Sequence, residues 1–381
     1  MISRICKWIV FKCIYPSVYF IGSHRQVDEH KIIFVENHGE LLSENYPYLM
    51  ELFQCRGYET KVHYLKMNLS GWGAIVGRSI KLIWDISNAK AIFLNESNSL
   101  FGMFTLRNET KLIQVWHACG AFKKWGFSVA DKQFGEDKKT LQQYSGHRNY
   151  DLVCVSGEAV CWAYEEAFGL SKDVSVVKPM GVSRTDVYYS DEKKALAKQR
   201  LEPYKEWIGG RKIVLYAPTF RGDIKTAFTP DVFDVKELSR FSERYVFFIK
   251  QHPFVKQPYS VPKECEEYCR EIRGELSTEE LLMVADVLIT DYSSIIFEYA
   301  LMRKPMIFFS HDLDAYYDER GFYYPYDTFV PGPIVKTMRE LVRQIETIEN
   351  FDKEKVERFV DAYMSGCDGN ATKRIVEYVI G

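Results

Sequence analysis

Side chains able to bind and transfer a phosphate group occur at four points in the sequence, each directly after a short apolar run. These clusters are His117 with Gly120, Lys123 and Lys124; Thr219 with Arg221; His252; and Ser293 with Ser294. A histidine can act as general base toward a hydroxyl, whereas cationic side chains and backbone N–H groups stabilise negative charge on phosphoryl oxygens. The combination indicates transfer of a phosphate-containing group.

The turn at residues 291–294 shows why one such cluster is ambiguous by itself. Residues 287–290 are typical of a buried parallel strand, and residues 295–302 of about two turns of helix that cannot continue past Pro305. A hydroxyl-rich turn at a helix start can bind an anion through free N–H groups and the helix dipole. The same residues can simply cap the helix. Three further clusters at strand ends favour the phosphate site.

The cysteines do not form a recognisable metal or redox motif. The nine cysteines are scattered, with no CxxC pair and no histidine beside a cysteine pair. We predict reduced cysteines, a cytosolic environment, no dedicated metal site and no cofactor; assistance by a divalent cation stays open. Cys119 can share a face of the chain with His117, but nothing nearby would activate its thiol, and we interpret it as a packing residue.

The order of the elements predicts an α/β protein with two domains. A chain of 381 residues exceeds one ordinary core, and its net charge of −2 gives no reason to expect nucleic acid as a partner. Apolar strand-like runs alternate with helical segments, which favours doubly wound parallel sheets whose ligands gather beyond the carboxyl ends of the strands. The expected strands are 31–36, 60–65, 91–94, 112–116, 151–155, 174–177, 213–217, 245–250, 287–290 and 306–309. We place the domains at 23–190 and 191–381, with a terminal helix from about residue 352 that can pack back on the first domain.

Two other segments have distinct expected roles. Residues 1–22 are apolar but interrupted by Arg4, Lys7 and Lys12, and they lack a small-residue cleavage site. On a helical wheel the apolar residues Ile2, Ile5, Cys6, Ile9, Val10 and Cys13 gather on one side. This pattern is typical of a helix lying in a membrane interface, although an ordinary packed helix is the alternative. Residues 128–149 are polar and are expected to form a loop or helix beside a site.

In their order along the chain, the polar clusters resemble the CDP-glycerol glycerophosphotransferases of wall teichoic acid and capsule synthesis. The resemblance covers roughly residues 85–375. Its blocks are QVWH at 114–117 with Gly120 and Lys123-Lys124, YAPTFR at 216–221, HP at 252–253, ITDYSS at 289–294, residues 303–309, RGF at 320–322, PGP at 331–333 and DGNA at 368–371.

The resemblance implies a GT-B-like fold with two doubly wound domains facing across a cleft, the first for the acceptor and the second for the CDP donor. It implies His117 as general base and His252 as a group that binds or polarises the transferred phosphate. Thr219, Arg221, Ser293 and Ser294 would hold the diphosphate, and Glu298 could reach the ribose or polyol. Gly120, Lys123 and Lys124 would lie near the acceptor or phosphate.

The implied reaction transfers glycerol phosphate from CDP-glycerol to a polyprenyl-diphosphate-linked saccharide and releases CMP. The protein would then be peripheral on the cytoplasmic face of the cell membrane, in contact with its anionic surface. The residues Ala118-Cys119-Gly120 stand where Gly-Thr is more common in polymerases of the family. This departure puts the local backbone shape in doubt, and the compact length favours a single-addition primase. CDP-ribitol as donor, a nucleotide-sugar glycosyltransferase, and a nucleotide-binding membrane scaffold without turnover are the alternatives.

Overall fold

The structure is a computed structural model that describes residues 4–132, 135–170 and 176–381, with no side-chain description at 317–320. The chain forms two compact units. Unit 1 contains Met1–Asp186 and Ser365–Gly381, and unit 2 contains Val187–Met364. The change of unit lies four residues before the expected domain boundary, and the last segment of the chain belongs to unit 1.

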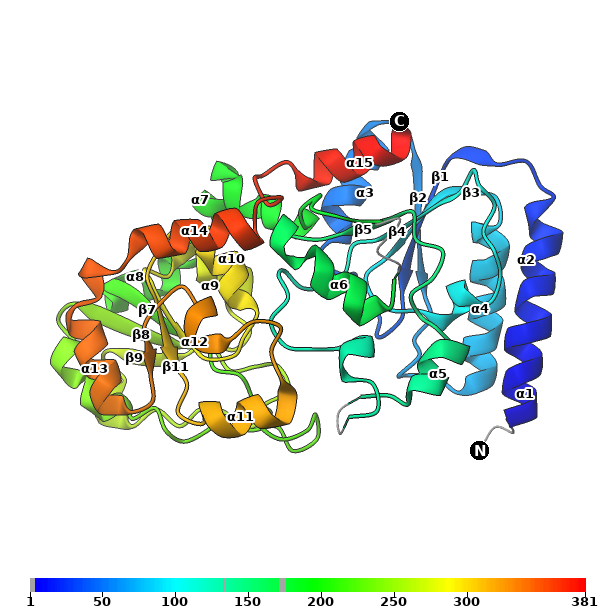
Figure 1. Cartoon of the computed structure of the whole chain (residues 1–381). Helices are drawn as coiled ribbons and strands as arrows, with labels where there is room; N and C mark the ends of the chain where they lie inside the picture. The colour runs from blue at the N-terminus through cyan, green and yellow to red at the C-terminus, as the bar shows by residue number, and fades with distance from the viewer. Residues whose placement is uncertain (1–3, 133–134, 171–175) are drawn as a thin grey trace. The chain divides into compact units, whose positions relative to one another are not determined.

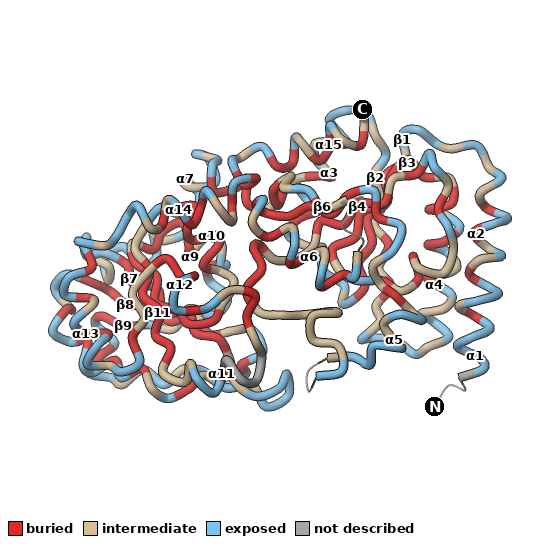
Figure 2. Tube along the Cα trace, in the orientation of Figure 1, coloured by how far each residue is buried: buried red, intermediate tan, exposed pale blue. Residues whose placement is uncertain are grey.

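Unit 1 is built on a six-stranded parallel sheet in the order β2-β1-β3-β4-β5-β6. Its strands are β1 (Asp28–Glu36), β2 (Glu59–Tyr64), β3 (Ala89–Leu94), β4 (Lys111–Gln114), β5 (Leu152–Cys154) and β6 (Val177–Lys178). The principal helices are α3 (Tyr46–Cys55), α4 (Trp72–Ile86), α5 (Lys138–Gln143), α6 (Cys161–Phe168) and α15 (Ala371–Ile380). Residues 32–36 of β1 are all buried, as expected for a strand covered on both faces (Figures 1 and 2).

Helix α15 completes the core of unit 1 although it comes from the end of the chain. Ile375, Val376 and Val379 are buried in one cluster with residues of α3 and of the sheet. Figure 1 shows α15 beside α3. Residues 365–381 are therefore part of the fold that carries the first histidine cluster.

Unit 2 repeats the architecture with a parallel sheet in the order β12-β11-β10-β7-β8-β9. Its strands are β7 (Lys212–Tyr216), β8 (Tyr245–Ile249), β9 (Cys269–Glu271), β10 (Val287–Thr290), β11 (Met306–Phe309) and β12 (Ile334–Val335). Its helices are α7 (Asp191–Arg200), α8 (Lys205–Ile208), α9 (Thr278–Val284), α10 (Ile295–Ala300), α11 (Leu313–Arg320), α12 (Tyr326–Phe329), α13 (Met338–Glu346) and α14 (Lys353–Tyr363). Capping boxes begin α9 at Ser277 and α13 at Thr337, so both helix starts are encoded locally.

The predicted α/β class with two parallel sheets is confirmed, and most expected strands are found within two residues. The strand expected at 112–116 ends at Gln114, because Trp116 adopts a left-handed backbone with φ of 53°. Residues 174 and 175 of the expected strand 174–177 lie outside the described part of the chain. The helix expected at 295–302 ends at Ala300 in a turn.

The N-terminal segment is one continuous helix made of α1 (Arg4–Ile9), a π-helical stretch (Val10–Ile14) and α2 (Tyr15–Ser23). Val10 and Tyr15, five residues apart, are both buried, because the wider π turn places residues i and i+5 on one side. The prediction that Val10 belongs to the membrane-facing apolar side of the helix is therefore wrong, because Val10 is buried in the protein. Ile5, Cys6, Ile9 and Cys13 are exposed.

The helix packs on unit 1 along a narrow stripe. Gly22 lies so close to α4 that an added Cβ would stand 2.2 Å from the Oγ of Ser87. The hydroxyl of Tyr19 accepts a hydrogen bond from the backbone N–H of Arg107 at 2.9 Å. Within the described residues, Ile5–Ser23 is the helix long and apolar enough to cross a membrane.

Candidate active site

Both sheets place their polar clusters where the order of the strands reverses. In unit 1 the chain leaves β1 for β2 on one side and returns to β3 on the other; in unit 2 the same reversal separates β7 from β10. The carboxyl ends of two parallel strands part at such a point and leave space for a ligand. Glu36 ends β1, Asn95 directly follows β3, and Asp291 follows β10. The candidate site residues lie around these two points.

His117 presents one ring nitrogen for proton transfer. Its Nδ1 lies 3.0 Å from the backbone carbonyl oxygen of Asn95, which can only accept, so Nδ1 carries the proton of the neutral ring. Nε2 is then left with its lone pair, as a general base requires. The surrounding protein lowers the pKa of His117 by desolvation, although the residue is exposed at the surface. The imidazole is accordingly neutral near pH 7.

A buried carboxyl group holds the residue that orients His117. The Oε2 of Glu36 accepts a hydrogen bond from the side-chain amide of Asn95 at 3.1 Å, and its Oε1 accepts the N–H of Ser43 at 2.5 Å. Glu36 is only 4% exposed, and burial raises its pKa above the ordinary value. Arg184 donates to the carbonyl of His117 at 2.9 Å. The histidine is thus fixed from both its ring and its backbone.

Trp116, just before the histidine, has a strained backbone that is held from both ends. Its N–H donates to the side-chain oxygen of Gln114 at 2.9 Å, and its carbonyl accepts from the amide of Asn45 at 2.7 Å. A left-handed conformation costs a non-glycine residue about 1–3 kcal/mol and persists only where neighbours enforce it. Here this turn ends β4 and carries His117.

The residues after His117 continue the same turn. Gly120 has a φ of 65°, and its N–H donates to the hydroxyl of Ser156 at 2.9 Å. Glycine suits this left-handed position because it has no Cβ. Cys119 is 2% exposed, in agreement with a packing role. Lys123 and Lys124 are half-buried in the segment that follows.

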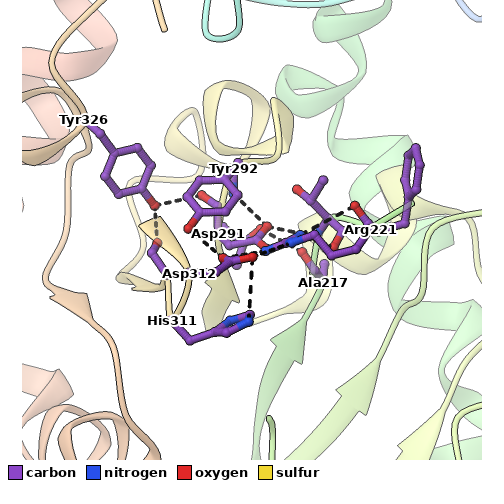
Figure 3. A network of polar contacts seen from close by, with 11 residues as sticks. Ala217, Arg221, Asp291, Tyr292, His311, Asp312 and Tyr326 are labelled. Atoms are coloured by element: carbon purple, nitrogen blue, oxygen red, sulfur yellow. Dashed lines mark hydrogen bonds and ion pairs between the residues drawn. The ribbon is translucent and has the colours of Figure 1, made fainter. Parts of the chain in front are cut away.

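In unit 2, Arg221 is the centre of an ion-pair network (Figure 3). It binds Asp312 through two bonds, Nε to Oδ2 at 2.7 Å and Nη2 to Oδ1 at 2.9 Å, and reaches the Oδ2 of Asp291 at 3.1 Å. Its Nη1 donates to the carbonyl of Thr219 at 2.7 Å. The other oxygen of Asp291 accepts the N–H groups of Thr219 at 2.8 Å and of Tyr292 at 2.6 Å. Two of the sequence-predicted clusters are thereby joined.

Aromatic rings enclose this network. The guanidinium of Arg221 lies 5.2 Å from the ring centre of Tyr292 and 5.0 Å from that of Tyr316, and these rings stack at 3.9 Å. The hydroxyl of Tyr292 donates to Asp312 at 2.9 Å. Burial disfavours the charge of Asp312, but its bonds to Arg221 outweigh that effect and hold its pKa below the ordinary value.

The hydroxyl-bearing residues lie at the edge of the network. The Oγ1 of Thr219 is buried and has no hydrogen-bond partner among the described residues. Ser294 precedes α10 without a side-chain cap bond, and the Oγ of Ser293 accepts from the N–H of Ile295 at a long 3.5 Å. Capping of α10 therefore uses little of the hydrogen-bonding capacity of the two serine side chains. Glu298, in the first turn of α10, is only 6% exposed.

His252 joins the same part of unit 2 through a ring contact. Its ring centre lies 4.7 Å from that of Phe220 and 4.6 Å from that of Phe254. Its Nδ1 accepts the N–H of Phe254 at 3.2 Å, so the proton of the neutral ring is on Nε2. This tautomer is the reverse of that of His117. It suits a donor to a phosphoryl oxygen.

Sequence reasoning missed Asp312 and the tyrosines around Arg221. The signal was present, because Ser310, His311 and Asp312 directly follow the apolar strand β11. His311 lies 3.7 Å from Asp312, and Ser310 shares a hydrogen bond with Tyr326 at 2.5 Å. Within the residues that the structure describes, no group of three His, Cys, Asp or Glu side chains could hold a metal ion.

Comparisons with known proteins agree with this architecture. The profile of the CDP-Glycerol:Poly(glycerophosphate) glycerophosphotransferase family matches residues 17–381. The teichoic acid poly(ribitol-phosphate) polymerase of Bacillus spizizenii is 34% identical, over 93% of this chain and 56% of the polymerase. The teichoic acid ribitol-phosphate primase of the same species is 31% identical, over 97% of this chain and 96% of the primase. The chain thus spans little more than half of the polymerase.

Among solved structures, a variant of the wall teichoic acid polymerase TagF superposes with a TM-score of 0.74. The two chains are 21% identical, over 99% of this chain and 95% of that one. The match confirms the predicted GT-B-like fold.

Replacing Asp312 is expected to weaken unit 2 selectively. Asp312→Asn removes the charge that holds Arg221, and losing hydrogen bonds to a charged group costs about 1.5–3 kcal/mol. We expect a lower Tm in calorimetry at pH 7. Because the pKa of Asp312 is depressed, its stabilisation is present above the ordinary pKa of about 3.9 and is lost as pH falls through the folded-state value. The difference in Tm should therefore shrink in acid.

Asp314→Asn is the matched control for this experiment. Its side chain is 92% exposed and pairs with Lys336 at the surface, where an ion pair contributes about 0–1 kcal/mol. Equal Tm values for the two variants would contradict the assigned role of Asp312.

Proposed function

Since this chain belongs to the CDP-glycerol:poly(glycerophosphate) glycerophosphotransferase family, we propose that it transfers a polyol phosphate from a CDP-polyol to a saccharide acceptor on a polyprenyl diphosphate. In this reaction an acceptor hydroxyl oxygen bonds to the distal phosphorus of the donor. The bond from that phosphorus to the bridging oxygen breaks, and CMP leaves with the electron pair. The hydroxyl proton passes to a base.

The orientation of His117 is the observation that carries the proposal. A general base needs an unprotonated nitrogen near neutral pH, and the bond from Nδ1 to the carbonyl of Asn95 reserves Nε2 for that role. Desolvation keeps the ring neutral. Glu36 and Arg184 act as positioning residues for this histidine.

The donor is assigned to unit 2. His252 offers an Nε2–H toward the transferred phosphate, and Ser293, Ser294 and the hydroxyl of Thr219 offer hydrogen bonds to the diphosphate. Arg221 has a less direct role than the sequence implied, because its donors are occupied by Asp312, Asp291 and the carbonyl of Thr219. One arginine between two carboxylates has a net charge of −1, so we propose that Arg221 orders the binding loop.

Two donors fit this arrangement, and one observation favours ribitol. The family description names CDP-glycerol, whereas the primase that aligns with nearly the whole chain is a ribitol-phosphate enzyme. We therefore propose CDP-ribitol beside the CDP-glycerol expected from the sequence. The same alignment supports a single addition. Glu298 is too buried to serve as an open contact for the polyol without rearrangement.

The N-terminal helix supports a peripheral position on the cytoplasmic face of an anionic membrane. Ile5, Trp8, Phe20 and Ile21 are 70%, 50%, 65% and 62% exposed, and the same helix has exposed Lys7 and Lys12. Figure 2 shows how little of α1 is buried. Exposed apolar and basic residues on one helix are typical of binding to anionic lipid.

Product analysis tests the reaction. The protein is incubated with a synthetic polyprenyl-diphosphate disaccharide and either CDP-glycerol or CDP-ribitol, and the products are measured by mass spectrometry. We expect CMP and an acceptor heavier by one polyol phosphate, with the ribitol donor preferred. Repeated addition would contradict the primase assignment. Binding of a CDP-polyol without CMP release over a panel of acceptors would favour a scaffold.

The pH profile tests His117 as the base. Its pKa is lowered, so kcat/KM should rise with pH through a midpoint below the ordinary histidine value of about 6.5 and level off above it. His117→Ala should lower kcat by about 10²–10⁴-fold and remove this limb. His30→Ala, at an exposed histidine of β1, is the control. An unchanged acid limb in His117→Ala would exclude the assignment.

Liposome flotation tests the membrane position. The double variant Phe20→Ser and Ile21→Ser removes two exposed apolar side chains and should reduce binding to anionic vesicles. Leu196→Ser, at a 46% exposed leucine of α7, should float like the parent protein. Equal flotation of the parent protein and both variants would contradict the proposed membrane contact of the N-terminal helix.

A further inference from the structure

A groove in unit 1 leads from the N-terminal helix to the tryptophan beside His117. Its inner part, a cavity of about 390 Å³, is lined by Trp116, Trp125, Phe127 and His147, among others. Its outer part, about 640 Å³, is lined by Ile5, Trp8, Asp137 and Lys139, among others. Both parts share Lys7, Thr140 and Tyr144, so they adjoin each other. We call the two parts together the lateral groove.

The inner part of the lateral groove has an aromatic wall. The rings of Trp116 and Trp125 lie nearly parallel, 6.1 Å apart between centres and 23° in tilt. His147 lies 6.0 Å from Trp116 and stacks on Phe168 at 3.7 Å. Burial lowers the pKa of His147 to about 3, so it is a neutral ring at physiological pH. Flat apolar rings of this kind pack against the C–H faces of sugars.

Polar groups border the same wall. The cavity is also lined by Ser97, Asn98 and Ser99, in the loop after β3. The hydroxyl of Tyr150 donates its proton to the carbonyl of Gly146 at 3.1 Å. The Nδ1 of His147 lies 3.0 Å from the same hydroxyl oxygen and therefore donates a hydrogen bond to it. The Nε2 of His147 is then an acceptor. An aromatic wall with a few hydrogen-bonding groups is the usual composition of a small-molecule site.

The outer part of the lateral groove combines positive charge with exposed apolar surface. The ammonium group of Lys7 lies 4.4 Å from the ring centre of Tyr144, and Lys139 lines the same cavity. Ile5 and Trp8 are 70% and 50% exposed. Asp137 is engaged at the start of α5, where it accepts from the N–H and hydroxyl of Thr140, both at 2.9 Å. The lateral groove thus offers an aromatic wall, then positive charge, then exposed apolar surface. An amphiphilic ligand with an anionic group between its polar and apolar ends fits this order.

The inner end of the groove meets the proposed base. The rings of Trp116 and His117 lie 4.3 Å apart at 30°, so the residue that lines the cavity also contacts the histidine. The left-handed backbone of Trp116, which two side-chain hydrogen bonds hold, fixes the directions of both the Trp116 and the His117 side chains. A saccharide lying on Trp125 and Trp116 would therefore bring a hydroxyl toward the imidazole.

We propose that the lateral groove is the binding site of the acceptor. The saccharide lies on Trp125 and Trp116, the diphosphate binds Lys7 and Lys139, and the polyprenyl chain leaves along Ile5 and Trp8 into the membrane. This assignment rests on the proposed function and deepens it, because it names the residues that recognise each part of the acceptor.

The test separates acceptor binding from turnover. A disaccharide with a short alkyl diphosphate is titrated calorimetrically into the full-length protein without donor and without membrane. Trp125→Ala should weaken binding about tenfold, as expected for the loss of one aromatic contact and its buried area. Trp125→Phe should restore most of the affinity. Lys7→Ala should weaken binding of the alkyl diphosphate compound but leave binding of the same disaccharide without diphosphate unchanged.

Kinetics with both substrates complete the test. Trp125→Ala should raise the KM for the acceptor about tenfold and leave the KM for the CDP-polyol within about twofold, which a folding defect would not do. Trp162→Ala, at a 39% exposed tryptophan of α6, is the matched control. Wild-type affinity in both Trp125→Ala and Lys7→Ala would overturn the assignment. Acceptor binding that depends on Trp125, without any CMP release, would uphold the groove and overturn the proposed function.

Discussion

Parallel pairing is the constraint on which the rest of this structure depends. Both six-stranded sheets are entirely parallel, so the carboxyl ends of the strands in each sheet lie at one edge. Apolar side chains predominate in the central strands because both faces are covered, and polar side chains gather at the strand ends and in the loops beyond. In unit 1 this rule brings Glu36, Asn95 and His117 together from three strand ends. Residues far apart in sequence become neighbours without any local signal that connects them.

Polar groups at such an edge must be held, and the two units hold them differently. Unit 1 orients His117 through the backbone carbonyl of Asn95, whose side-chain amide binds the buried Glu36. Unit 2 uses charge, with Arg221 between Asp291 and Asp312. Removing charges from water is expensive, so such a network adds little net stability as a whole, whereas loss of one partner leaves the others unpaired and destabilises the fold. A backbone carbonyl that fixes the ring tautomer suits a base, whereas a rigid set of N–H and hydroxyl groups suits a diphosphate.

The sequence predicted the parts of this architecture that have long or repeated signals. Runs such as 245–250 and 287–290 identified strands, and the polar residues after strands led to the prediction of His117, Arg221 and His252 as site residues. Strands β9 and β12 have only three and two residues and lack the longer apolar run that marked the equally short β5 and β6. The bond of Asp312 to Arg221 joins residues 91 apart and follows from the position of β11 in the sheet. The left-handed turn at Trp116 depends on Asn45 and Gln114, and the preceding apolar run gave no sign of it.

That turn also explains why the proposed base and the aromatic wall are found on one short segment. Had β4 continued through residue 116, Trp116 and His117 would project to opposite faces of the sheet. The left-handed residue breaks this alternation, and the two rings come to lie against each other. The cost of about 1–3 kcal/mol for the backbone is offset by two side-chain hydrogen bonds, each worth about 1 kcal/mol. Strain at Trp116 is thus the means by which one turn of chain sets the aromatic wall of the proposed acceptor groove beside the proposed base.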